Sequence, residues 1–250
     1  SSFETPCEST ARLLLAWVMS EEPSIPTHIV HALRLGGDVE AVCQWLASQD
    51  DEKALTAAMR TAATTHEYAT EAKLRFVQLA LARGADPNRM CNVNTDPFTQ
   101  LSKLKGFSTL CMVSTQATDL SLRLIDLLIR WGAGVDWLQA RATFPLDDDR
   151  TEIHKYSPLA CAILYASSYG TRRIAVAQAL LRCGASLDSV AKIKVYDSQG
   201  ARIARRSESI EWVLGEKERR EPLLADKARY LKVKAFLLSV RAAGDYRSFV

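Results

Sequence analysis

The feature that most constrains the fold of this chain is a helix-stop signal that occurs three times. In each case an apolar run reaches an arginine and soon ends at Gly-Ala, with the glycines at Gly84, Gly132 and Gly184. The helix dipole favours a cation in the last turn, and glycine can adopt the left-handed conformation that closes a helix. A stop signal that recurs indicates a repeated structural unit. Such units usually stack into an array whose product is a binding surface.

Two helices are predicted before each stop. In the last unit the first helix begins at Ser157-Pro158, where serine can cap the helix and proline suits its first position. The predicted helical pieces before the three stops are 55–62 and 71–83, 108–113 and 120–130, and 157–162 and 171–182. Each unit is therefore predicted to be a helix, a short break, a second helix and a tight turn.

These units resemble the ankyrin repeat, whose first helix opens on Thr-Pro-Leu-His-x-Ala and whose second helix ends at Gly-Ala-Asp. The resemblance covers roughly residues 28–188. The usual histidine of the family is replaced by Cys111 in one unit and Ala160 in another, and the stops are 48 and 52 residues apart. An ankyrin repeat is about 33 residues long, so the surplus forms long segments after the turns. The resemblance implies an all-α fold, an ankyrin-like helical-repeat solenoid of four to five helix pairs with extended loops.

One departure from helix is predicted near the C-terminus. Residues 191–206 alternate polar and apolar side chains on both sides of Asp197-Ser198-Gln199-Gly200, a pattern typical of a β-hairpin. We therefore expect a single elongated domain over 1–250. Its expected parts are an N-terminal capping helix in 1–25, core repeats in 26–188, a hairpin insertion in 189–207 and C-terminal capping helices in 208–250.

Composition favours an intracellular chain in a reducing compartment, the cytoplasm or the nucleus. No apolar run approaches the ~20 residues that a membrane-spanning helix needs, and no secretory signal opens the sequence. The six cysteines show no metal-binding spacing, and four of them fall in apolar helical patterns, where free thiols act as small hydrophobes.

Charge is unevenly distributed. Residues 189–250 hold 14 Lys/Arg against 8 Asp/Glu, whereas the rest of the chain is slightly acidic. Such asymmetry is typical of a region that meets an acidic partner, nucleic acid or a membrane surface, although alternating signs can also form a solvated face. The predicted basic patch lies on the hairpin and comprises Lys192, Lys194, Arg202, Arg205 and Arg206.

Motifs of catalysis and metal binding are absent from the sequence or incomplete. The chain has no phosphate-binding glycine loop, dinucleotide fingerprint or nucleophile elbow. His28 and His31 are three residues apart on a predicted helix and could share a metal ion with Cys43 or Asp38. Packing and solvation of the two histidines is the simpler interpretation. We therefore predict no catalytic residues, no metal and no cofactor.

The long segments after the stops are the predicted partner-binding regions, since aromatic and arginine side chains are typical of interface hot spots. The candidates are Met90, Asn92, Phe98, Trp137, Arg141 and Phe144. For each aromatic residue the alternative is that it folds back onto the helices as local core. The sequence thus predicts a non-catalytic protein–protein interaction module or scaffold that binds another protein with its loop tips and concave face.

Two other functions stay open. The chain could be a structural subunit held permanently in a large assembly. Alternatively, the basic hairpin in 192–206 could bind an acidic or phosphate-bearing ligand such as nucleic acid or a lipid headgroup.

Overall fold

The computed structural model describes residues 25–63, 70–90, 104–116, 118–146, 150–165, 172–220 and 227–250. These residues fall into two compact units, which are described separately. The first contains the described residues up to Asp86, and the second contains the described residues from Pro87 onward. The capping helix predicted in 1–25 lies almost entirely outside the described residues, so it stays a prediction.

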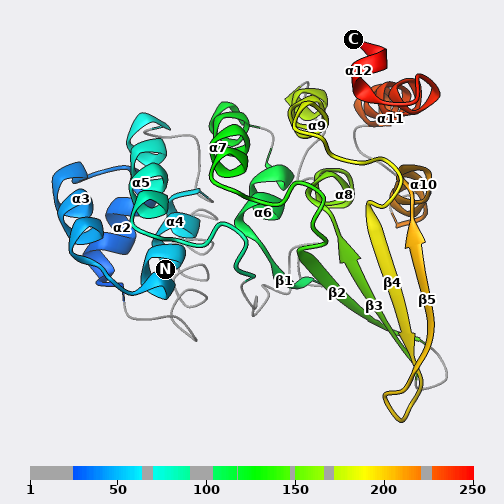
Figure 1. The fold of residues 1–250 in the computed structure, drawn as a ribbon, viewed down its shortest axis with the longest axis horizontal. Coiled ribbons are helices and arrows are strands. Elements are labelled where there is room, and N and C mark those ends of the chain that lie inside the picture. The colour runs from blue at the N-terminus through cyan, green and yellow to red at the C-terminus, as the bar shows by residue number, and fades with distance from the viewer. Residues whose placement is uncertain are drawn as a thin grey trace, which may run out of the picture. The chain divides into compact units, whose positions relative to one another are not determined.

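The first unit is a four-helix stack. Its helices are α2 (Thr27–Leu35), α3 (Val39–Ser48), α4 (Glu52–Ala63) and α5 (Thr70–Ala82). Helix α2 packs on α3 and α4, and α5 packs on α3 and α4 (Figure 1). Helix α4 is the central element, because every residue from Ala54 to Ala63 is buried. Its small alanine side chains let the neighbouring helices approach closely.

The second unit combines two rows of helices with a sheet. One row contains α6 (Thr109–Thr115), α8 (Pro158–Leu164) and α10 (Ile210–Arg220). The other contains α7 (Asp119–Arg130), α9 (Arg172–Arg182) and α11 (Lys227–Ala242), followed by the short α12 (Tyr246–Phe249). Contacts run along each row and between the partners of each pair (Figure 1). Helices α10, α11 and α12 therefore lie in 208–250, the region where C-terminal capping helices were predicted.

The three predicted stop signals are confirmed. Gly84, Gly132 and Gly184 have φ angles of 104°, 89° and 93°, in the left-handed region. In each stop the alanine after the glycine donates its backbone N–H to the carbonyl five residues earlier, and the glycine donates to the carbonyl three residues earlier. This is the Schellman pattern, which satisfies the last carbonyls of a helix.

Successive repeats are also joined by contacts that the sequence did not reveal. The residue four positions after one stop glycine binds the turn of the next repeat. The Asn88 side-chain oxygen accepts from the backbone N–H of Gly134 at 2.9 Å, and the Asp136 carboxylate accepts from that of Ser186 at 2.6 Å. Both acceptors bind the residue two positions after the next stop glycine. The same clamp therefore joins two successive pairs of turns.

The all-α prediction is wrong. The second unit contains a five-stranded antiparallel sheet in the order β1-β2-β3-β4-β5. Its strands are β1 (Leu104–Phe107), β2 (Ala140–Pro145), β3 (Thr151–Tyr156), β4 (Ala191–Tyr196) and β5 (Arg202–Glu208). Residues 140–156, in the segment after the second stop that was predicted as a loop, therefore form the β2–β3 hairpin, which pairs with β1 on one side and with the β4–β5 hairpin on the other. Pairing satisfies backbone groups that a loop would leave to water, which is the physical reason for the difference.

The hairpin predicted near 191–206 is confirmed as β4 and β5. The Asp197 carboxylate accepts from the backbone N–H groups of Gln199 and Ala201, and Gly200 has a φ of 79°. These contacts fix the turn.

Buried cations join helices of the second unit, one between the two rows and one along a row. Arg173 of α9 is 1% exposed and donates to the carbonyls of Ser114 and Thr115 at the end of α6, at 3.1 and 3.0 Å. Lys217 of α10 is equally buried and donates to the Leu164 carbonyl at the end of α8. Each cation therefore meets the negative end of a helix dipole and satisfies carbonyls that the helix leaves unpaired. Among the described helices, none is long and apolar enough to cross a membrane.

Candidate functional site

The sheet of the second unit has two chemically different faces. Strand register places Ala140, Tyr156, Ala191 and Glu208 in one cross-strand row, and Ala142, His154, Ile193 and Arg206 in a second row on the same face. Most of these side chains are buried, so this is the inner face. Residues one position along each strand point to the other face, because side chains alternate along a strand.

The outer face carries a cluster of cations, which we call the basic face. Arg141, Lys155 and Lys192 lie directly opposite one another on β2, β3 and β4. Two residues further along β4, Lys194 lies opposite Arg205 of β5. Neighbouring strands are about 4.8 Å apart, so the row of three spans roughly 10 Å. The basic face is therefore Arg141, Lys155, Lys192, Lys194 and Arg205, contributed by four strands.

Within the described part of the sheet, the basic face has no neutralising carboxylate. The strands contain two acidic residues, Glu152 and Glu208, and both lie on the inner face. Glu152 is hydrogen-bonded to His154, and Glu208 forms an ion pair with Arg206. The five basic side chains are exposed or half-buried. Like charges directly opposite one another destabilise a sheet, so this arrangement weakens the free protein.

Mutual repulsion affects the pKa of the central lysine. The pKa of Lys192 is lowered, chiefly by the positive charge of Arg205, then by partial desolvation and by Lys194 and Lys155. An anion placed on this face would relieve the repulsion, because an opposite charge favours the protonated amine.

Part of the predicted basic patch lies together and part does not. Lys192, Lys194 and Arg205 share the basic face. Arg206 lies on the inner face and pairs with Glu208 at 2.7 Å. Arg202 lies opposite Tyr196, beyond a register shift near the tip of the hairpin. Neighbouring residues on a strand cannot share a face, which separates Arg205 from Arg206.

Sequence reasoning assigned no role to Lys155 and gave Arg141 a different one. Residues 151–156 alternate in the structure, with His154 and Tyr156 buried and Lys155 between them. The sequence itself carries only a weak form of this period of two, because the inner side contains the polar Glu152 and His154 and the outer side contains the apolar Ile153.

The predicted partner-binding residues do not form one surface. Arg141 is on the basic face, whereas Phe144 is on the inner face with its ring 4.6 Å from that of His154. Trp137 is 58% exposed in the turn before β2 and lies against Gly134, and Met90 is 39% exposed. Asn92 and Phe98 lie outside the described residues. For Phe144 the structure therefore favours the alternative of local packing.

A hydrogen-bonded cluster forms part of the inner face. The two imidazole nitrogens of His154 lie 2.9 Å from the Tyr156 hydroxyl and 2.8 Å from the Glu152 carboxylate. The ring also contacts Phe144 and Trp212 of α10. His154 is 4% exposed. With both nitrogens bonded and aromatic rings around it, this histidine holds α10 against the sheet.

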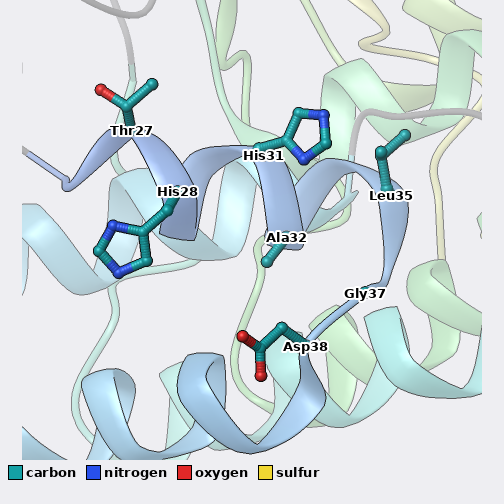
Figure 2. A pocket seen from close by; sticks show the side chains of 7 residues that line it. All are labelled: Thr27, His28, His31, Ala32, Leu35, Gly37 and Asp38. Atoms are coloured by element: carbon teal, nitrogen blue, oxygen red, sulfur yellow. The ribbon is translucent and has the colours of Figure 1, made fainter.

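An open depression of about 780 Å³ lies over α2 in the first unit, between its histidines and the start of α3 (Figure 2). Figure 2 shows that the rings of His28 and His31 do not converge. The Asp38 carboxylate already accepts from the backbone N–H of Ala41 as the cap of α3. No group of three metal-binding side chains occurs in the part of the chain that the structure describes. The depression therefore has no set of converging polar groups.

Comparison with known proteins adds no family assignment. Neither the family models nor the curated proteins that were searched gave a match to this chain. The choice of candidate site therefore depends on the structure alone, and the strand register favours the basic face.

Proposed function

We propose that this chain is a non-catalytic interaction module that binds an acidic segment of another protein on the basic face. The observation that carries the proposal is the alignment of five cations on one side of the sheet, while both described strand carboxylates lie on the other side. Such a surface steers and orients an anionic partner through complementary charge. Binding is favoured over catalysis because the other side chains of this face, namely Thr143, Pro145, Thr151, Ile153, Tyr196 and Ser207, add no carboxylate, imidazole or thiol.

An acidic protein segment fits the face better than nucleic acid. The register places one aromatic ring on this face, Tyr196 at the end beyond Lys194, and none beside Arg141, Lys155 or Lys192. Proteins that bind single strands instead stack successive bases on aromatic side chains. The face is also compact, roughly 14 Å across its four strands, whereas a nucleic-acid footprint needs an extended basic stripe. Helices on the inner side hold the sheet rigid, so the partner meets a preorganised surface.

We further propose that the chain is an ankyrin-like repeat protein in which elaborated fingers form the sheet. The repeated Gly-Ala stops, the clamps of Asn88 and Asp136, and the alternation of helix pair with hairpin support this proposal. In ankyrin-like proteins the projecting turns recognise partners. In this chain that role would fall to the paired hairpins rather than to separate loop tips.

A reducing compartment, the cytoplasm or the nucleus, completes the proposal. Cys111 and Cys161 are buried, hydrogen-bond to each other and remain free thiols. Burial raises the pKa of the Cys161 thiol, so it remains protonated and unreactive at neutral pH.

The test compares three labelled anions by fluorescence anisotropy: a short polyglutamate peptide, a single-stranded RNA of equal charge, and vesicles containing phosphatidylserine. The variant Lys155→Glu/Lys192→Glu reverses the centre of the face. Its control is Lys227→Glu/Lys232→Glu, which changes net charge equally at exposed positions of α11.

The peptide should bind the protein best, and the face variant should weaken it about tenfold or more while the control has little effect. Equal losses in both variants would mean that only net charge matters. Tighter binding of RNA or vesicles than of the peptide would reassign the face to those ligands. Either result would overturn the proposed function.

A further inference from the structure

The strand β5 is the exposed edge of the sheet next to the basic face. It pairs with β4 on one side and ends the strand order on the other (Figure 1). It is the longest of the described strands, with seven residues, and residues 202–207 are all exposed. An edge strand presents a row of backbone N–H and C=O groups that can pair with another chain.

Proteins usually protect such an edge with a short strand, proline, a bulge or lysine. Here the strand is long and contains no proline, and its one register shift lies at the tip, between Val195 and Tyr196 of the partner strand. All of its cations are arginines, at Arg202, Arg205 and Arg206, whereas those of β3 and β4 are lysines. Arginine binds carboxylates with two parallel hydrogen bonds, which lysine cannot do.

We propose that the acidic segment of the partner binds as an extended strand that pairs with β5 and adds a sixth strand to the sheet. The inference deepens the proposed function and rests on it. Backbone hydrogen bonds along β5 supply the pairing, and the alternating side chains of the added strand supply the selectivity.

Charge and shape on β5 define the sequence that fits. Arg205 projects on the basic face, so a carboxylate opposite it would also approach Lys194 in the same cross-strand row. Ile203 is 53% exposed at the edge and offers an apolar contact to the partner. The fitting segment therefore alternates acidic with β-branched residues, and its acidic side faces the basic face.

The same charges disfavour pairing of β5 with β5 of a second copy. A symmetric antiparallel pair of this strand centred on Arg205 would place the two Arg205 side chains directly opposite each other, and one centred on Ala204 would place Arg202 opposite Arg206. Like charges on neighbouring strands are destabilising. Pairing of β5 with a second copy is thus disfavoured, whereas pairing with an acidic strand is favoured.

Three peptides of equal charge test the inference. The first alternates glutamate with valine, the second has the same sequence with N-methyl groups on every second residue, and the third carries the same number of glutamates with glycine in place of valine. N-methylation removes backbone donors from one edge of the peptide and keeps its carboxylates. Affinity is measured by anisotropy, and amide exchange of residues 202–208 is measured by NMR or mass spectrometry.

The alternating peptide should bind about tenfold more tightly than its N-methylated form, the factor expected for losing one or two net hydrogen bonds. It should also slow amide exchange in β5 more than in β1. Equal affinity of the first two peptides, together with loss of binding in Lys155→Glu/Lys192→Glu, would overturn strand addition and leave the proposed function in place. If none of the three peptides binds, the proposed function fails as well. Tighter self-association than peptide binding would also overturn the inference.

Discussion

Arg173 offers the sharpest test of how the second unit is held together. Its guanidinium is buried and donates to the carbonyls of Ser114 and Thr115, where α6 ends. The substitution Arg173→Met keeps the apolar stem and removes both charge-assisted hydrogen bonds. Each such bond contributes about 1.5–3 kcal/mol, and a buried acceptor left unpaired costs more still.

We expect Arg173→Met to lower the free energy of unfolding by about 3–5 kcal/mol after allowing for the lower desolvation cost of methionine. The matched control is Arg172→Met. Arg172 pairs with Asp119 at 2.8 Å, but the two side chains are 45% and 69% exposed. Exposed pairs of this kind contribute little, so the control should change stability by under about 1 kcal/mol.

Urea unfolding at neutral pH, followed by tryptophan fluorescence and by far-ultraviolet circular dichroism, measures both variants. Replacing a buried ion by a hydrophobic side chain is neutral or stabilising in some proteins. That outcome for Arg173→Met would refute the reasoning, since it would show that the α6 carbonyls do not depend on the guanidinium.

Three further predictions follow from the charged groups and the clamps. Lys155→Glu should raise the melting temperature by ~2–4 °C at low salt and less at high salt, because it converts two like-charge neighbours into opposite ones; calorimetry at both salt concentrations tests this. Burial lowers the pKa of Lys73 to about 8. The unfolded chain then holds more protons above pH 8, so stability of the first unit should increase from pH 8 to about 10.4, and Lys73→Met should flatten that rise in urea titrations. Asp136→Ala, which leaves the Ser186 N–H without its acceptor, should cost about 1–2 kcal/mol, whereas Asp126→Ala on the exposed side of α7 should cost less.

Local signals in the sequence predicted the helices well. The Gly-Ala stops depend on one glycine conformation, and Ser108 and Ser157 cap their helices through the backbone N–H groups of Cys111 and Ala160. Such contacts span three to five residues, so a single sequence contains all the information they need. The confirmed hairpin is local in the same sense, because Asp197 fixes its own turn.

The sheet could not be predicted in the same way, because its pairings are distant in sequence. Strand β3 pairs with β4 across the whole of α8 and α9, and β1 pairs with β2 across α6 and α7. Segments such as 140–145 are short, and a short strand pattern is easily taken for a loop when its partner is unknown. The ankyrin resemblance reinforced that error, since it implied helices joined by extended loops.

The basic face depends on the same long-range register, which explains why only part of it could be predicted from the sequence. Arg141, Lys155 and Lys192 are 14 and 37 residues apart along the chain, yet they occupy one row. That row is unfavourable for the isolated protein, and one substitution at Lys155 should both stabilise the sheet and weaken anion binding. A surface retained against its own repulsion is the pattern expected where binding, rather than stability, determines the residues. If Lys155→Glu neither raised the stability of the protein nor lowered its affinity for the polyglutamate peptide, the charges would be independent and solvated. The basic face would then not be a binding site.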